Sequence, residues 1–211
     1  MPATEKCGQK RPPPLGDDND GGGKRPAVPA PPSDDDEADM CWLCHEDGPD
    51  ESGHPLRRDC SCRGGSGWAH FPCIVGYAKQ KTEQWRARDG VVKFNEPWWK
   101  CPSCKQEYQN ELAVELANEF LSFVKEKYPD DHLRHVWALR RKLDALLDVF
   151  GQMQQHQKEE VEQTGNKILS IIEQMKTANP TLPKAILQYE GDTYNNLGCF
   201  AFKEGTKKVQ K

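Results

Sequence analysis

The sequence has no long apolar run. Nowhere among its 211 residues does an uninterrupted apolar segment reach about 18 residues, the length that a membrane-spanning helix needs. The first residues, MPATEKCGQK, also lack the apolar stretch of a secretory signal. We therefore expect no membrane span and an intracellular location, either cytoplasmic or nuclear. In such a reducing compartment, the nine cysteines are better suited to metal binding than to disulfide bonds.

An excess of basic residues is absent too. The 33 Asp and Glu residues outnumber the 29 Lys and Arg residues, which gives a net charge of −4. Residues 1–40 alone contain nine acidic and five basic residues, so the rest of the chain is neutral overall, with 24 residues of each sign. Surfaces that bind duplex nucleic acid are usually basic. We therefore expect no nucleic acid among the partners.

Large apolar residues are rare in residues 1–39, which are rich in Pro, Gly and Asp. Such a segment cannot bury enough apolar surface to offset the conformational entropy that it would lose on ordering. The sequence therefore predicts a disordered, acidic and Pro-rich tail before the first folded domain.

Aliphatic residues are scarce from residue 41 to residue 104, a segment that holds seven of the nine cysteines. A segment so poor in Leu, Ile and Val needs something other than an apolar core to fold. Its best-spaced zinc ligands form four ordered pairs: Cys41 and Cys44, Cys60 and Cys62, His70 and Cys73, and Cys101 and Cys104. A Cys-x-x-Cys turn directs two thiolates to one ion, and four pairs complete two tetrahedral sites. We therefore predict two structural zinc ions.

The order and spacing of these ligands resemble those of the RING-CH, or RING-variant, zinc finger. One residue separates the third and fourth ligands, and seven precede the histidine. The supporting residues of that family are also present, namely Leu43, Gly65, Ser66, Trp68 and Pro102. The resemblance implies a small zinc-stabilised cross-brace finger over residues 40–108. In a cross-brace, one ion would be held by Cys41, Cys44, His70 and Cys73, and the other by Cys60, Cys62, Cys101 and Cys104.

The resemblance also implies a function. The RING-type fingers that this segment resembles are ubiquitin-protein ligases, which are transferases. Such a ligase docks a ubiquitin-conjugating enzyme and holds its linked ubiquitin in a reactive pose. It forms no covalent intermediate of its own. The residues that match the family's docking groove are Leu43, Tyr77, Pro102 and Lys105. PHD fingers use the same ligand order, and their characteristic Trp matches Trp99. The alternative is therefore a non-catalytic peptide reader or scaffold, with Trp42 and Trp68 as its aromatic cage.

Two further features of the cysteine-rich segment carry expectations. His45 and His54 are close to the ligands, but the eight better-spaced residues already fill both sites, so we predict exposed loop positions for both. Residues 91–100, VVKFNEPWWK, combine a β-like run with two tryptophans. We expect this segment to pack in the core.

Residues 109–211 predict an all-α helical array. Apolar residues recur at helical spacing in residues 110–129, 130–151 and 159–180, and again from residue 185 onward. The last of these stretches resembles the first helix of a tetratricopeptide repeat, at Tyr194, Leu197, Gly198 and Ala201. We expect these helices to recruit a protein substrate to the finger.

Overall fold

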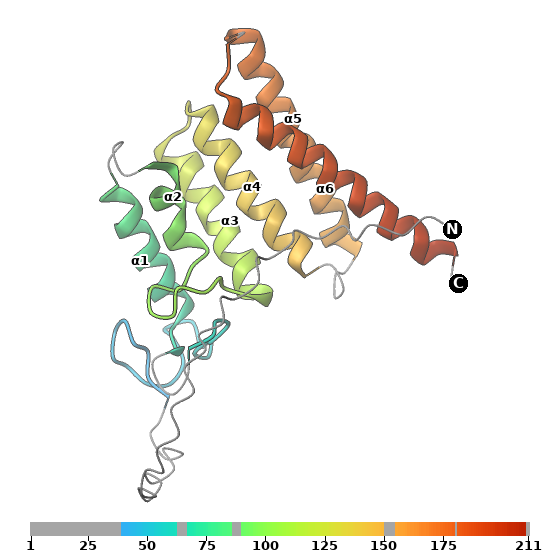
Figure 1. Cartoon of the computed structure of the whole chain (residues 1–211). Helices are drawn as coiled ribbons and strands as arrows, with labels where there is room; N and C mark the ends of the chain where they lie inside the picture. Colours follow the sequence, from blue (N-terminus) through green and yellow to red (C-terminus); the bar gives the residue numbers. More distant parts are fainter. Residues whose placement is uncertain (1–38, 63–66, 86–89, 150–154, 180, 210–211) are drawn as a thin grey trace, which may run out of the picture. The chain divides into compact units, whose positions relative to one another are not determined.

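The computed structural model describes the helices of the chain and the loops of its cysteine-rich part (Figure 1). The described residues are 39–62, 67–85, 90–149, 155–179 and 181–209. The predicted tail lies outside them, apart from its last residue. The described elements are α1 (Phe71–Glu83), α2 (Gly90–Asn95), the 3₁₀ helix η3 (Glu96–Trp98), α3 (Asn110–Lys127), α4 (His132–Asp148), α5 (Gln155–Ala178) and α6 (Lys184–Val209). None of these helices is long and apolar enough to cross a membrane.

Helix α1 is the long helix of the cysteine-rich part. It follows His70 directly, and a proline stands within its first two positions, where the missing N–H has no partner to lose. Its buried residues recur at helical spacing, so they share one face: Ile74, Val75, Ala78 and Thr82. The Thr82 hydroxyl donates to the Ala78 carbonyl and accepts from the Trp98 indole, both at 2.8 Å. The hydrogen bond from the Trp98 indole connects α1 to η3.

Residues 91–98 are helical rather than β-like, because α2 continues into η3, which ends at Trp98. Phe94 and Trp98 stand four residues apart, so a helix directs both side chains to the same side. Both are buried, with exposed fractions of 0% and 1%. Packing of these two rings therefore overrides the strand preference of the valines that precede them. The expectation that this segment packs in the core is confirmed for Trp98, whereas Trp99 is half-buried.

Aromatic side chains from both sides of residue 108 form one cluster. The Trp98 ring stacks on Phe120 of α3, with centroids 5.1 Å apart. The Phe94 ring lies 5.9 Å from that of Phe120 and 5.7 Å from that of Trp137 on α4. The cysteine-rich part and the first two helices of the array therefore share an apolar core.

Helices α3 to α6 confirm the predicted all-α array. Each packs against the next along the chain, and α4 also contacts α6 (Figure 1). Helix α4 begins after Asp131, whose carboxylate accepts a hydrogen bond from the Arg134 N–H at 2.9 Å and so caps the helix. At the α5–α6 contact, the Leu197 side chain packs on Gly165, where any Cβ would lie 2.7 Å from the leucine. The tetratricopeptide resemblance stays a prediction.

Candidate metal centre

The four pairs of predicted ligands come together as two clusters. The first contains Cys41, Cys44, His70 and Cys73, and the second contains Cys60, Cys62, Cys101 and Cys104. Within each cluster, the four ligand atoms lie within 4.8 Å of one another. This partition is the cross-brace that the resemblance implies. Tetrahedral zinc accepts both donor sets, three thiolates with one imidazole and four thiolates, so the residues fit two structural zinc ions with no open position.

The two Cys-x-x-Cys pairs adopt the same local fold, which we call the first knuckle (residues 41–45) and the second knuckle (residues 101–105). In each, the residue after the pair, His45 or Lys105, donates its N–H to the carbonyl of the pair's first cysteine, at 2.8 and 3.0 Å. These two residues have φ of 63° and 61°, in the left-handed region. The turn directs both thiols of a knuckle to one point. An isolated antiparallel β-bridge closes each knuckle.

His70 is oriented by a hydrogen bond outside its cluster. Its Nε2 lies 3.1 Å from the Gly48 carbonyl oxygen, which can only accept, so Nε2 carries the proton. The lone pair of Nδ1 then faces the cluster, 3.4 Å from Cys44 Sγ and 3.8 Å from Cys73 Sγ. A bond of this kind fixes the tautomer and ring orientation of a metal-bound histidine. Gly48 has a φ of 74°, a conformation that favours glycine.

The segment from residue 60 to residue 73 joins the two clusters. It supplies one pair of ligands to the second cluster and one pair to the first. The expected supporting residues Gly65 and Ser66 lie outside the described residues. Gly67 is described, and a Cβ there would lie 2.6 Å from Cδ of Arg58 and 2.7 Å from Cβ of Cys62. Glycine at this position therefore lets the segment pass close to the second cluster.

The thiol pKa values show why the clusters need a cation. Burial raises the pKa of Cys73 to about 12, and it also raises the pKa of Cys62. Burial opposes the ionisation of Cys41 and Cys104 as well, but hydrogen bonds from backbone N–H groups and from neighbouring cysteine thiols outweigh it and lower both pKa values to about 7. The thiols of one cluster therefore resist ionising together at neutral pH. Zinc binds thiolates, so thiol ionisation and metal binding are coupled.

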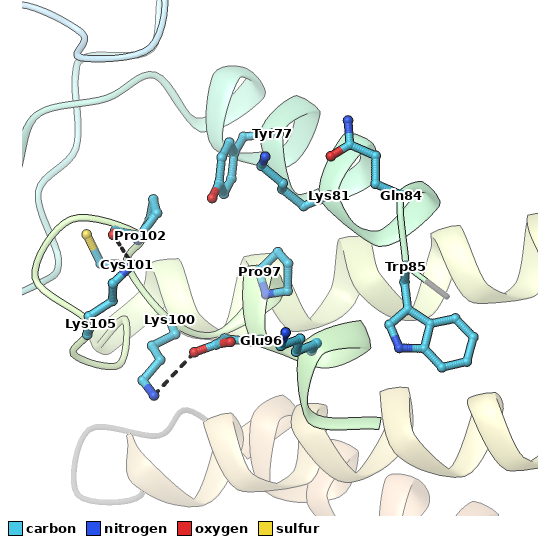
Figure 2. A pocket seen from close by; sticks show the side chains of 11 residues that line it. Tyr77, Lys81, Gln84, Trp85, Glu96, Pro97, Lys100, Cys101, Pro102 and Lys105 are labelled. Atoms are coloured by element: carbon cyan, nitrogen blue, oxygen red, sulfur yellow. Dashed lines mark hydrogen bonds and ion pairs between the residues drawn. The ribbon is translucent and has the colours of Figure 1, made fainter. Parts of the chain in front are cut away.

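A groove of about 470 Å³ lies beside the second knuckle (Figure 2). It is lined by residues of α1 and of the two positions after it, and by residues of α2, of η3 and of the second knuckle. Three of the four predicted docking residues line it: Tyr77, Pro102 and Lys105. Leu43 does not line the groove; it is half-buried and packs against the apolar core. Its neighbour Trp42 contacts the Tyr77 ring edge-on, with centroids 6.0 Å apart. Through Trp42, the first knuckle therefore contacts one residue of the groove lining, Tyr77.

The groove also contains residues that the sequence interpretation did not single out: Lys81, Gln84, Trp85, Lys93, Glu96, Pro97 and Lys100. Four of the groove's lining residues are lysines and one is a glutamate. Glu96 lies 3.4 Å from Lys100 Nζ, so that pair is neutral and the rest of the groove is basic. Tyr77 and Lys81 stand four residues apart on α1. A helix prediction for residues 71–83 would have placed them on one face.

The two other histidines of this part lie outside both clusters, as predicted. His45 and His54 are exposed loop residues. His54 Nδ1 lies 3.4 Å from the carboxylate of Asp50, which also accepts the backbone N–H of His54 at 2.9 Å. These contacts close a loop and leave the eight clustered ligands as the metal-binding set.

Comparison with known proteins identifies the finger. Residues 41–87 match the family model of the RING-variant domain. No curated protein matches the chain, and no solved structure matches it. The matched segment contains the first three ligand pairs, and the structure adds Cys101 and Cys104, which complete the second cluster. The chain thus contains a RING-variant zinc finger with complete ligand sets for two structural zinc ions, followed by an array of helices.

Proposed function

We propose that this protein is a ubiquitin-protein ligase that docks a ubiquitin-conjugating enzyme on its RING-variant finger. RING-variant domains are generally associated with ubiquitin ligases. The observation that carries the proposal is the groove beside the second knuckle, which brings together Tyr77, Pro102 and Lys105. Closed zinc sites offer no position for a substrate, so the finger works as a docking surface rather than through its metal ions.

The finger acts by positioning its partners. The zinc sites and the packing of α1 fix the groove before a partner binds, which reduces the entropy lost on docking. The docked enzyme carries ubiquitin as a thioester. A substrate amine attacks the thioester carbonyl, the C–S bond breaks, and the conjugating enzyme leaves as a thiol. This chain forms no bond to ubiquitin; it contributes proximity and orientation.

The groove indicates the chemistry of the docked face. The rings of Tyr77, Trp85 and Pro102 offer apolar contact to a side chain of the conjugating enzyme. The lysines around them favour a partner that presents carboxylates beside that apolar side chain, because complementary charge guides docking and sets its register. Lys81 Nζ lies 5.8 Å from the Tyr77 ring, at the boundary of the two kinds of surface.

We propose that Lys105 contacts ubiquitin as well as the conjugating enzyme. It is exposed, and it directly follows the last ligand of the second knuckle. In the free protein its Nζ donates to the Pro102 carbonyl at 2.5 Å. We propose that Lys105 exchanges this bond for acceptors on the two docked proteins.

The helical array is the proposed substrate-binding part. It packs directly on the finger through the stack of Trp98 on Phe120. A protein that is bound by the array is therefore held near the docked enzyme. This arrangement increases the effective concentration of substrate amines at the thioester.

The alternative function, a peptide reader, requires an open aromatic cage. Trp42 and Trp68 are the candidate cage residues, and both rings already contact the chain itself. Trp42 packs against Tyr77, and the Arg58 guanidinium carbon lies 5.0 Å from the centroid of the Trp68 ring. These contacts favour the ligase.

An autoubiquitination assay with a panel of ubiquitin-conjugating enzymes tests the proposal. We expect the zinc-loaded protein to build ubiquitin chains, and we expect Cys41→Ser to abolish them because it removes a zinc ligand. The double variant Lys81→Glu with Lys93→Glu should keep both ions but react at least about tenfold more slowly, which corresponds to roughly 1.4 kcal/mol of lost docking energy.

The matched control is Lys125→Glu, which reverses a charge on the exposed surface of α3 outside the groove. We expect it to react like the parent. A parent protein that holds two zinc ions and is inactive with every conjugating enzyme contradicts the ligase proposal and favours the reader.

A further inference from the structure

The groove beside the second knuckle ends at Trp85. In Figure 2 this residue lies at the opposite end of the groove from Pro102 and Lys105. Trp85 stands two positions after the end of α1, and its backbone N–H donates to the Thr82 carbonyl at 3.0 Å. This bond holds the backbone. The direction of the indole ring depends on the side chains that pack against it.

Two side chains that contact the Trp85 ring come from different parts of the protein. Phe94 of α2 meets it edge-on, with ring centroids 5.3 Å apart. Arg134 of α4 lies over it, with the guanidinium carbon 5.4 Å from the ring centroid. Phe94 belongs to the cysteine-rich part of the chain, whereas Arg134 belongs to the helical array. The array therefore contacts a residue that lines the groove.

The guanidinium of Arg134 lies among three aromatic rings. Its carbon is 4.3 Å from the centroid of the Tyr128 ring and 5.2 Å from that of the Phe94 ring, besides its contact with Trp85. A planar guanidinium stacks on aromatic faces and attracts each of them through the charge distribution of the ring. One cation therefore holds three rings in fixed places relative to one another.

The polar atoms of Arg134 show that the rings are its main partners. Asp131, whose carboxylate caps α4, forms an ion pair with the guanidinium, so Arg134 adds little net charge to the groove. Its Nε is buried and has no hydrogen-bond partner in the described part of the chain. Burying an N–H without an acceptor costs free energy. An apolar side chain of similar length would avoid this cost, but it would not attract the three rings.

We propose that Arg134 is a positioning residue for ubiquitin transfer, because it holds the Trp85 ring in place at the end of the groove. The inference rests on the ligase function proposed above. A ring that is already fixed loses less freedom when the conjugating enzyme docks, which favours binding. Residues 41–87 match the family model, whereas Arg134 lies on α4, at residues 132–148. The docking surface is therefore completed by a helix of the array.

The substitution Arg134→Met tests the proposal, because methionine has a similar length but no charge and no planar group. Arg141→Met is the matched control. Arg141 also lies on α4, pairs with Asp144 at 2.6 Å, and lies over a tryptophan, 4.8 Å from the Trp99 centroid. Trp99 does not line the groove. We expect both full-length variants to keep two zinc ions and the helix content of the parent by circular dichroism.

Fluorine NMR of protein labelled with fluorotryptophan follows the rings themselves. The substitutions Trp85→Phe and Trp99→Phe assign the two signals. We expect Arg134→Met to shift the Trp85 signal and to leave the Trp99 signal in place, and we expect the reverse for Arg141→Met. A Trp85 signal that does not move in Arg134→Met overturns the proposal.

Discharge of ubiquitin from a loaded conjugating enzyme measures the consequence for transfer. We expect Arg134→Met to raise the KM for that enzyme at least about fivefold and to leave kcat nearly unchanged, since Trp85 contributes to docking rather than to the chemical step. Arg141→Met should leave both constants unchanged. In a Trp85→Ala background, Arg134→Met should raise the KM no further, because Arg134 acts through Trp85.

The outcomes separate this proposal from the ligase function. An active parent whose KM is unchanged by Arg134→Met, or is raised equally by Arg141→Met, overturns the role of Arg134 and leaves the ligase standing. A further rise of KM in the Trp85→Ala background also overturns it. A parent that is inactive with every conjugating enzyme contradicts both. If Arg134→Met loses helix or zinc, Arg134→Lys replaces it; it keeps a charge beside Asp131 but lacks the planar group, so it should raise the KM in the same direction.

Discussion

The finger and the helical array are each stabilised by a different kind of side chain. In the finger, eight ligands gather into two clusters, and the long helix α1 has four buried residues. In the array, α3 alone has eight buried residues. A structural zinc site can contribute on the order of 10–16 kcal/mol to folding, which matches or exceeds the net stability of about 5–15 kcal/mol of a typical domain. A segment that is poor in aliphatic residues can therefore fold only with its ions, whereas the array folds by burying apolar stripes.

The two parts nevertheless share a core. Trp98 comes from the cysteine-rich segment, yet its ring lies between α1, through the bond to Thr82, and α3, through the stack on Phe120. Loss of the finger therefore exposes part of α3. Helices α5 and α6 lie further along the array, where they pack against α4 and against each other, so they should depend least on zinc.

Zinc removal should have the largest effect, because it should unfold the finger and leave the last two helices of the array folded. A chelator removes the ions, and the freed thiols then become protonated or exposed. We therefore expect the finger to unfold completely while α5 and α6 stay helical. Hydrogen exchange read by mass spectrometry should show lost protection in residues 41–85 and 100–108, and retained protection in α5 and α6. Added zinc should restore the protection. A finger that stays protected without metal contradicts this account.

The next largest effect should come from the shared aromatic cluster. Trp98→Ala removes a ring that is 1% exposed, and we expect it to lower the free energy of unfolding by about 3–5 kcal/mol. Trp99→Ala is the matched control, because Trp99 is half-buried beside Lys100 and Arg141, with cation-to-centroid distances of 5.2 and 4.8 Å. We expect it to cost only about 1 kcal/mol. Urea unfolding followed by circular dichroism measures both, and equal losses would contradict the assignment of the core.

These contrasts also explain what could be predicted from the sequence. Metal ligation requires particular residue types at short spacings, so the eight ligands were recognisable without knowledge of the fold. Helical periodicity is local too, and it revealed the array. The helix at residues 90–95 was not recognisable, because it depends on Phe94 packing against distant residues such as Phe120. The groove depends on the same long-range packing of α1 against η3, which is why Lys81 and Trp85 were missed and Leu43 lies outside its lining.

Two glycine substitutions, one in the array and one in the finger, should change the stability of the protein by smaller amounts. In the array, Gly165→Ala places a Cβ 2.7 Å from Leu197, and we expect it to destabilise the protein by about 1–3 kcal/mol. In the finger, Gly76→Ala on α1 meets nothing within 4 Å and should stabilise the protein by about 0.5–1 kcal/mol. Thermal unfolding of the two zinc-loaded variants should therefore shift in opposite directions. Two shifts of the same sign would show that the α5–α6 contact is looser than the Gly165–Leu197 distance implies.

The smallest expected effect concerns the ion pair between Lys176 of α5 and Glu190 of α6. A hydrogen bond from the Lys176 ammonium to Glu190, at 2.5 Å, raises the pKa of that lysine. Because the raised pKa belongs to the folded state, the attraction is complete below the ordinary lysine pKa of 10.5 and fades as the pH rises through the folded-state value. Glu190→Gln should lower the Lys176 pKa in an NMR titration and cost little stability, since solvent still reaches both half-buried side chains and salt screens their attraction. Lys167→Gln, at an exposed position of α5, is the control and should leave the Lys176 pKa unchanged. A Lys176 pKa that does not move in Glu190→Gln would show that the α5–α6 contact relies on its apolar residues alone.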